Sequence, residues 1–287
     1  MSEIDYAALK QGGIIKQKQP DLFSIRVRIL VGNIEADDMV ALAGLAKKYG
    51  RGILHLTMRQ CVEIPFVHFD DLNEIQRELE ELGFKLGACG PRVRVVTACQ
   101  GWAVCPHALG DAAKLAESLD GRFYGMGQLP HKFKMAVTGC PNACIKPQEN
   151  DVGFVAVVEP ALEEAECIGC GLCEEVCPTG AIRMEGNLPV IDRGKCSNDG
   201  KCVQSCPTGA LYAARKGWHV YAGGKFGRKP QLGVLLADFA SEEEVISLVQ
   251  RIIDVYRKSA NHRERLGDVI NRMGLERFRE AVEGGQS

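Results

Sequence analysis

The chain has 287 residues, of which 46% are hydrophobic and 25% are charged, and its formal net charge is -2. This length allows about two domains, and the balanced charge lacks the basic excess typical of nucleic-acid-binding proteins. No apolar run approaches the roughly 20 residues of a membrane-spanning helix. The N-terminal segment, MSEIDYAALKQGG, lacks the apolar stretch of a secretory signal. We therefore expect a cytoplasmic protein with no membrane span and no nucleic-acid partner.

The first third of the chain has a β-α-β-β-α pattern. Residues 23–31 alternate as a strand does, and residues 52–58 and 62–67 predict two further strands. Apolar residues at helical spacing predict helices over Ala36–Tyr49 and residues 72–82, each followed by a glycine. The pattern predicts a small sheet with helices on one face.

The remainder of the chain predicts a larger α+β domain that is interrupted by a cysteine-rich module. Strands are expected at residues 92–97, 133–138, 151–158, 218–221 and 232–236, and a glycine-rich loop at 223–227. Helices are expected near residues 109–119, 242–259 and 263–283. The predicted domains are therefore 1–88, then 89–160 together with 213–287, and an insert at 161–212.

The insert contains a duplicated cysteine motif. The chain has thirteen cysteines, and clustered cysteines in a reducing compartment indicate metal or redox chemistry rather than disulfides. The run C-x2-C-x2-C-x3-C-P begins at Cys167 and recurs at a constant offset from Cys196. In bacterial two-cluster ferredoxins the fourth cysteine of such a run binds the other cluster. One cluster would therefore take Cys167, Cys170, Cys173 and Cys206, and the other Cys177, Cys196 and Cys202.

The second of these clusters lacks one cysteine. Asp199 stands at the position that matches Cys170 in the first copy. A carboxylate is a harder ligand than a thiolate, so the alternatives are a 4Fe-4S cluster with Asp199 or water as a ligand, and a 3Fe-4S cluster. Zinc is another reading of C-x2-C pairs, which the duplicated Cys-Pro runs disfavour.

A second cysteine group lies outside the insert. Cys99 and Cys105 follow one predicted strand, and Cys140 and Cys144 follow another. Four thiols at such strand-to-loop corners could hold a further 4Fe-4S cluster. The alternative is four unconnected core cysteines, since free cysteine is often buried. The glycines and prolines beside both pairs favour the cluster.

These motifs resemble the sirohaem-containing sulfite and nitrite reductase family. The resemblance rests on C-x5-C, on LPHKFKMAVTGCPNAC and on the segment TMRQ in a ferredoxin-like half-domain. It implies an α+β fold of a ferredoxin-like half-domain plus a sirohaem- and 4Fe-4S-binding domain, here with an inserted two-cluster ferredoxin domain. Cys144 would couple the sirohaem to a 4Fe-4S cluster also held by Cys99, Cys105 and Cys140.

Basic residues occur two apart in three predicted strands. Such residues share one face of a strand, and a buried cation is costly unless it is paired. The pattern therefore suggests an anionic ligand, although solvated sheet edges are the alternative. The pairs are Arg26 with Arg28, Arg92 with Arg94, and Lys132 with Lys134.

The family resemblance assigns roles to several of these cations. Substrate binding is implied for Arg26, Arg94, Lys132 and Lys134, and a sirohaem carboxylate contact for Arg59. Further candidate cofactor contacts are Gln60, Arg28, Asn142, Lys225 and Arg228. Cys61 and Cys89 lack partners at ligand spacing and are expected to be structural thiols.

The predicted function is the six-electron reduction of sulfite to sulfide. Electrons would enter through the inserted clusters, and lysines would supply protons because arginine barely deprotonates. Nitrite reduction to ammonia is one alternative, although a strongly basic pocket favours the more highly charged sulfite. A non-catalytic iron–sulfur electron-transfer subunit is another. A single copy of the half-domain resembles small or dissimilatory sulfite reductases, so we expect a homo- or hetero-oligomer and an electron-donor protein.

Overall fold

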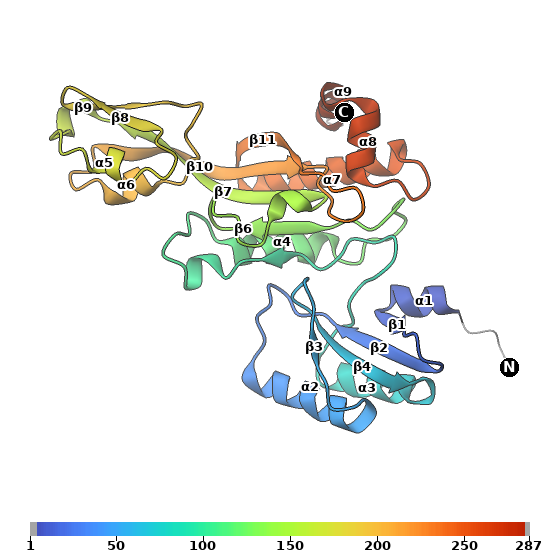
Figure 1. Ribbon diagram of the computed structural model, residues 1–287. Helices are drawn as coiled ribbons and strands as arrows, with labels where there is room; N and C mark the ends of the chain where they lie inside the picture. The colour runs from blue at the N-terminus through green and yellow to red at the C-terminus, as the bar shows by residue number, and fades with distance from the viewer. Residues whose placement is uncertain (1–4, 285–287) are drawn as a thin grey trace.

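The computed structural model describes residues 5–284. Its first part is a four-stranded antiparallel sheet in the order β1-β2-β4-β3, with α2 and α3 packed on one face (Figure 1). The elements are α1 (Tyr6–Gln11), β1 (Ile14–Lys16), β2 (Leu22–Val27), α2 (Ala36–Tyr49), β3 (His55–Leu56), β4 (Val62–His68) and α3 (Leu72–Glu81). The predicted β-α-β-β-α order is confirmed, and β1 and α1 are added before it.

Two strands of this half-domain, β2 and β3, are shorter than the apolar pattern predicted, whereas β4 matches its prediction to within one residue. β2 ends at Val27 rather than at residue 31, where Val31 adopts a positive φ of 60°. β3 has only two residues, because a turn follows it in which Gln60 N–H donates to the Thr57 carbonyl. This turn carries Arg59 toward the second domain.

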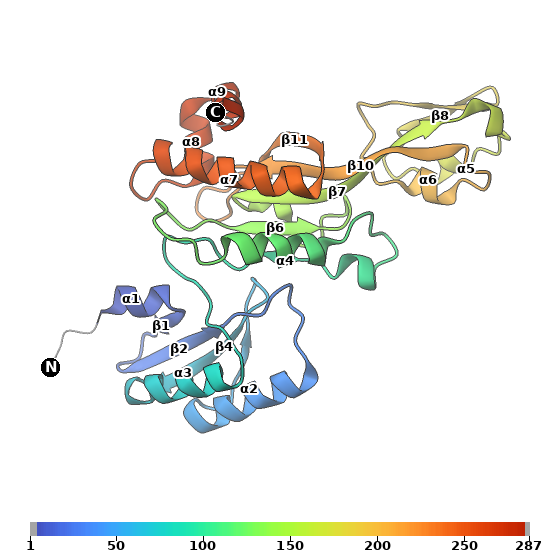
Figure 2. The same ribbon diagram turned by 180° about the vertical axis from the view of Figure 1, so that it is seen from behind.

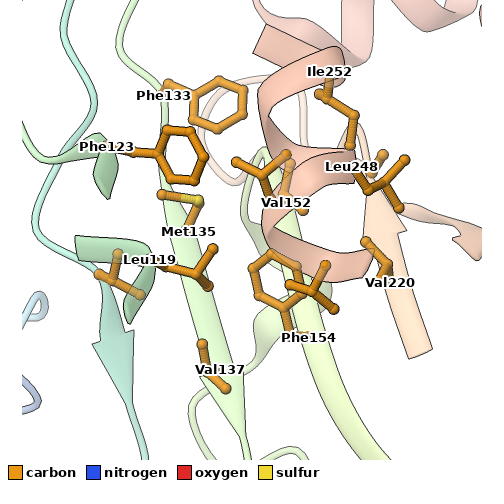
Figure 3. Packing of buried hydrophobic residues seen from close by; sticks show 14 of the residues in the cluster. Leu119, Phe123, Phe133, Met135, Val137, Val152, Phe154, Val220, Leu248 and Ile252 are labelled. Atoms are coloured by element: carbon orange, nitrogen blue, oxygen red, sulfur yellow. The ribbon is translucent and has the colours of Figure 1, made fainter. Parts of the chain in front are cut away.

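The second domain is a five-stranded mixed sheet in the order β11-β10-β7-β6-β5. Neighbours among β5, β6 and β7 are parallel, whereas β10 is antiparallel to both β7 and β11. α4 and α7 cover one face and enclose a core that includes Phe123, Met135 and Phe154 (Figure 3). The strands are β5 (Thr97–Ala98), β6 (Met135–Thr138), β7 (Val152–Leu162), β10 (Leu211–Ala222) and β11 (Val234–Ala240).

The helices of this domain are α4 (Ala112–Phe123), α7 (Glu242–Ser259), α8 (Leu266–Met273) and α9 (Leu275–Glu283). The bounds predicted for α7 are confirmed, and Ser241 and Glu244 form a capping box at its start. The single helix predicted over 263–283 is wrong. α8 ends at Met273, and the next residue, Gly274, has a positive φ of 88° that glycine tolerates.

The cysteine-rich insert leaves the sheet after Leu162 and returns at Leu211. It projects from the end of the long β7–β10 ribbon, away from the half-domain (Figures 1 and 2). It contains α5 (Leu172–Glu175), β8 (Ile182–Glu185), β9 (Leu188–Ile191) and α6 (Lys201–Ser205), and β8 and β9 form a hairpin. Within residues 5–284, no helix is both long and apolar enough to cross a membrane.

Candidate active site and cysteine clusters

The cations that the sequence singled out come from separate elements. Arg26 lies in β2 of the half-domain, Arg94 precedes β5, and Lys132 and Lys134 precede β6. Burial lowers the pKa of Arg94, and Arg26 is among the charges that lower it further. Burial likewise lowers the pKa of Lys132, with a contribution from Arg94. Contacts link the four cations in sequence: Arg26 contacts Cys89, Arg94 donates to the adjacent Ala88 carbonyl, and the Arg94 N–H donates to the Phe133 carbonyl between the two lysines.

The reason predicted for this grouping needs correction. Of the three basic pairs, only Arg26 lies in a regular strand, because β2 ends before residue 28 and β5 and β6 begin after the other two pairs. Residues 93 and 94 instead bond to separate segments: Val93 N–H donates to the Met126 carbonyl, and Arg94 N–H donates to the Phe133 carbonyl at 2.9 Å. The convergence therefore arises from the domain junction rather than from a shared strand face.

Arg59 ties the half-domain to the second sheet. It donates to the carbonyls of Val95 and Met135, the latter at 3.0 Å, and to Asn150 Oδ1 at 3.1 Å. Burial lowers its pKa to about 10. Its Nε is buried without a hydrogen-bond partner among the described residues. Such an unsatisfied donor on a buried cation fits an anionic ligand.

Arg94 presents the same feature. Its Nη1 donates to the Ala88 carbonyl and its Nη2 to the Gly90 carbonyl, both at 3.1 Å. No partner within residues 5–284 contacts its buried Nε. Among residues 5–284 no carboxylate is bonded to Arg94, and its two hydrogen bonds go to backbone carbonyls.

Of the four predicted substrate cations, Arg26 is the one with a carboxylate partner among the described residues. Its Nε donates to Glu63 Oε1 at 2.8 Å, and its Nη1 contacts Cys89 Sγ at 3.0 Å. Burial lowers the pKa of Arg26, but Cys89 and Glu63 outweigh that effect and the pKa is raised overall. Sequence reasoning treated Cys89 as a structural thiol, and the structure places it in the cation group.

The lysines are suited to proton transfer. Burial lowers the pKa of Lys134 to about 8, and the charges of Arg59, Lys132 and Arg265 act in the same direction. A donor whose pKa lies near the working pH is an effective general acid. Asp151, directly before β7, accepts from the Lys134 backbone N–H at 2.8 Å. Sequence reasoning missed both Asp151 and Arg265, because each is isolated in the sequence.

Two of the further cofactor candidates have carboxylate partners of their own. Arg28 binds Asp120, and its guanidinium lies 4.2 Å from the Tyr124 ring centroid. Lys225 binds Asp268 at the start of α8. These carboxylates balance both charges within the described chain, although Arg28 Nε, like that of Arg59 and of Arg94, is buried without a hydrogen-bond partner there.

The other candidates divide into one bonded residue and two exposed ones. Gln60 donates to the Ala98 carbonyl at 2.7 Å and accepts from Ala98 N–H at 3.0 Å. Its amide therefore extends the edge of the sheet at β5. Asn142 and Arg228 are exposed.

The four cysteines outside the insert also converge. Cys99 follows β5 and Cys140 follows β6, and these parallel strands end at one edge of the sheet. Gly139 N–H contacts Cys99 Sγ at 3.2 Å. Burial raises the pKa of Cys140, and Cys105, Cys144 and Cys99 raise it further. The four thiols are therefore neighbours, as a shared cluster requires.

The first ligand set of the insert lines one cavity. Cys167, Cys170, Cys173 and Cys206 line one small pocket, whose apolar walls include Leu162. The fourth cysteine comes from the other copy of the motif, which is the ligand exchange expected for two-cluster ferredoxins.

The second set of the insert, Cys177, Cys196 and Cys202, lies near Asp199. Burial raises the pKa of Cys202 to about 12, and the charges of Cys196, Asp199 and Cys177 act in the same direction. Asp199 Oδ1 accepts from the Lys201 N–H at 2.9 Å. The carboxylate that replaces a cysteine in the motif therefore lies beside the other members of its set.

Two of the three cysteine sets supply four thiolates each, the number that a 4Fe-4S cluster takes. Among the residues that the structure describes, no three His, Cys, Asp or Glu side chains are arranged to hold one metal ion. In a four-iron cluster each thiolate binds a different iron, so the sulfurs do not converge on one point. The cysteine sets and the unsatisfied arginines thus fit iron–sulfur clusters beside an anionic cofactor or substrate.

Comparison with known proteins gives two family matches. The nitrite/sulfite reductase ferredoxin-like half domain matches residues 15–82, and the nitrite and sulphite reductase 4Fe-4S domain matches residues 89–286. The chain is 38% identical to the coenzyme F420-dependent sulfite reductase of Methanocaldococcus jannaschii over 96% of its own length, and spans only 44% of that relative. It is 29% identical to one of the subunits of the anaerobic sulfite reductase of Salmonella typhimurium, covering 90% of this chain and 82% of that one.

Nitrite reductases and solved structures are similar as well. The nitrite reductase [NAD(P)H] large subunit of Klebsiella oxytoca is 25% identical over 91% of this chain and 21% of its own. Dissimilatory sulfite reductase I aligns with a TM-score of 0.75 at 20% identity, over 91% of this chain and 69% of that one. The NirA protein of Mycobacterium tuberculosis aligns with a TM-score of 0.70 at 20% identity, over 98% and 47%. These two structures support the α+β fold.

Proposed function

Because the chain belongs to the nitrite and sulphite reductase family, we propose that it reduces sulfite to sulfide. The observation that carries this proposal is the group of cations at the domain junction, in which Arg59 and Arg94 have buried Nε donors without partners in the described chain. Oxyanions suit such donors, because charged hydrogen bonds to them are strong.

The same residues fit the cofactors that the family implies. Cys99, Cys105, Cys140 and Cys144 would hold a 4Fe-4S cluster, with Cys144 also coupling it to a sirohaem, and Arg59 would contact a sirohaem carboxylate. Together these groups would supply the electrons at the substrate sulfur. Arg26 and Arg94 would bind sulfite oxygens, and Lys132 and Lys134 would donate protons to those oxygens as they leave as water.

Nitrite reduction is the second candidate, because relatives named nitrite reductase are also similar to this chain. Steady-state reduction of both anions by the purified protein, with reduced methyl viologen as donor, separates the two. Our proposal expects the higher kcat/KM for sulfite. A higher value for nitrite would overturn the substrate assignment, and turnover of neither anion would favour an electron-transfer subunit.

The insert would supply electrons, and its contacts suggest the order in which electrons pass through its two cysteine sets. The Val158 N–H of β7 donates to the Asn198 carbonyl at 2.9 Å. A Cβ at Gly200 would lie 3.2 Å from Leu109 Cδ2, so this loop touches the segment that follows Cys105. Beside the other set, Ile168 is 67% exposed. We therefore place the Cys167 set on the side of the electron donor and the Asp199 set next to the catalytic domain.

Asp199 should retain the fourth iron of the second insert cluster. Asp199→Ala is expected to lower the iron content by about one atom per chain, since only three thiolates remain in that set. Asp199→Cys should keep the full iron content. Iron analysis and the electron paramagnetic resonance signal of a three-iron cluster measure both variants. Asp192→Ala is the matched control, because Asp192 caps a turn in the same insert by accepting from Gly194 N–H at 2.9 Å.

Sulfite turnover should fall at alkaline pH. The lowered pKa of Lys134, about 8, means that its ammonium is present below that pH and is lost above it. A general acid must be protonated to act, so kcat is expected to decline about tenfold per unit above pH 8. Lys134→Arg should flatten this limb of the pH profile, because arginine stays charged. An unchanged limb in that variant would exclude Lys134 as its source.

A further inference from the structure

A buried ion pair joins the C-terminal helices to the cation group. Arg265, directly before α8, donates from Nη2 to Asp151 Oδ2 at 2.7 Å and from Nε to Oδ1 at 3.1 Å. The Asp151 side chain has no exposed area, and that of Arg265 is 12% exposed. Asp151 Oδ2 also accepts from the Lys134 backbone N–H at 2.8 Å. One carboxylate oxygen thus connects Arg265 to the segment that carries Lys134.

Neighbouring contacts hold this junction in place. Arg263 N–H donates to the Pro130 carbonyl at 3.2 Å, and Gly223 N–H donates to the Asp151 carbonyl at 2.8 Å. The Tyr256 hydroxyl of α7 donates to the Glu264 carbonyl at 2.6 Å. The loop between α7 and α8 is therefore fixed against residues 130–134 from several sides.

We propose that Arg265 is a positioning residue of the anion-binding site, which holds the segment of Lys132 and Lys134 in place through Asp151 and biases Lys134 toward proton donation. This inference rests on the proposed function of the lysines as proton donors. It extends the site to a residue from the last fifth of the chain, beyond the cations that the family motifs indicate.

The electrostatic surroundings of Lys134 support this role. Positive charges face it from three elements: Arg59 from the β3–β4 turn, Lys132 from its own segment, and Arg265 from the start of α8. Asp151 opposes them as the negative charge that acts on Lys134. Arg265 also contributes to the lowered pKa of Lys132. Its effect therefore covers both lysines.

The proton step balances without a further reactant. An N–H bond of the Lys134 ammonium breaks as an O–H bond forms on a substrate oxygen, which leaves a neutral amine. The charge of Arg265 opposes the ammonium more than the amine, so it favours this direction. Water then returns the proton to Lys134 for the next transfer.

Competitive acetylation of the purified holoprotein by acetic anhydride measures the Lys134 amine without relying on turnover. The exposed Lys229 serves as the internal standard. Arg265→Gln is expected to slow acetylation of Lys134 at pH 7 about tenfold, because a pKa higher by one unit leaves about a tenth of the neutral amine. Asp151→Asn should have the opposite effect and speed it, since the negative charge is removed.

Two controls separate positioning from a purely structural salt bridge. Arg263→Gln removes a charge from an exposed position on the same loop and should leave the Lys134 rate unchanged. Arg265→Lys retains the charge and should restore most of the rate lost in Arg265→Gln. Should Arg265→Gln fail to fold, the direction of the Asp151→Asn effect decides.

The result that overturns the proposal is a Lys134 acetylation rate in folded Arg265→Gln, or in Asp151→Asn, equal to that of the unsubstituted protein. Because the readout is amine reactivity, that result stands apart from the proposed function. Absence of sulfite turnover with the expected acetylation shifts would instead refute the function and leave the positioning role of Arg265 intact.

Discussion

Cys140→Ser is expected to abolish sulfite reduction and to remove the iron of the cluster outside the insert. Cys140 is 7% exposed and lies among the other three thiols of its set. Serine is a poor replacement for a soft thiolate ligand. Loss of a residue that only supports a metal ligand costs about 10–100-fold, so loss of the ligand itself should exceed about 100-fold in turnover.

Iron content and the visible spectrum check this expectation together with the rate. Cys61→Ser is the matched control, since Cys61 is 2% exposed and belongs to none of the three sets. That variant should retain the iron and the visible bands. A Cys140→Ser protein with full iron content would contradict the assignment of Cys140 as a ligand.

Arg94→Gln is expected to lower kcat/KM for sulfite by about 10²–10³, the usual cost of removing one preorganised donor to a developing charge. The iron and sirohaem contents should remain, because Arg94 is not assigned to hold either group. Arg94→Lys should be intermediate, since a lysine keeps the charge but loses the planar fork.

The neighbouring Arg92 provides the control for Arg94. It contacts Gln11 at 3.3 Å and belongs to the same irregular segment, so Arg92→Gln should leave sulfite turnover near that of the unsubstituted protein. Arg94 also bonds the Ala88 and Gly90 carbonyls, so thermal unfolding of each variant should be measured alongside. Equal losses in the Arg92 and Arg94 variants would contradict a specific role for Arg94.

The parts of the fold predicted best were those with a strong local pattern. The helix Glu242–Ser259 has a cap and regular apolar spacing, and its bounds were confirmed. The apolar spacing over residues 263–283 continues through Gly274 and outweighed the stop signal that this glycine offers, although its positive φ ends α8 there. Isolated strands such as Thr97–Ala98 depend on partners distant in the sequence, and apolar runs overestimated their length.

The site residues likewise fall into those that a local sequence pattern predicted and those that it did not. Cys99 and Cys140 could be associated from sequence because each follows a strand and adjacent parallel strands end at one edge. The Arg265–Asp151 pair could not, since it joins residues far apart in the sequence that carry no motif. The partner of Arg28 escaped prediction for a related reason: Asp120 lies in α4, and a pattern read along one strand does not reveal a buried partner on another element.

The most direct test of the iron–sulfur and sirohaem assignment is an anaerobic visible spectrum of the purified protein with iron counting and pyridine extraction. We expect a Soret band with the red-shifted band of a sirohaem-type macrocycle. We also expect about twelve cluster irons per chain, in three four-iron clusters, besides the sirohaem iron. A broad shoulder at about 400 nm, with no extractable tetrapyrrole after expression in a sirohaem-producing host, would contradict the assignment. The protein would then be an electron carrier with the fold of a reductase.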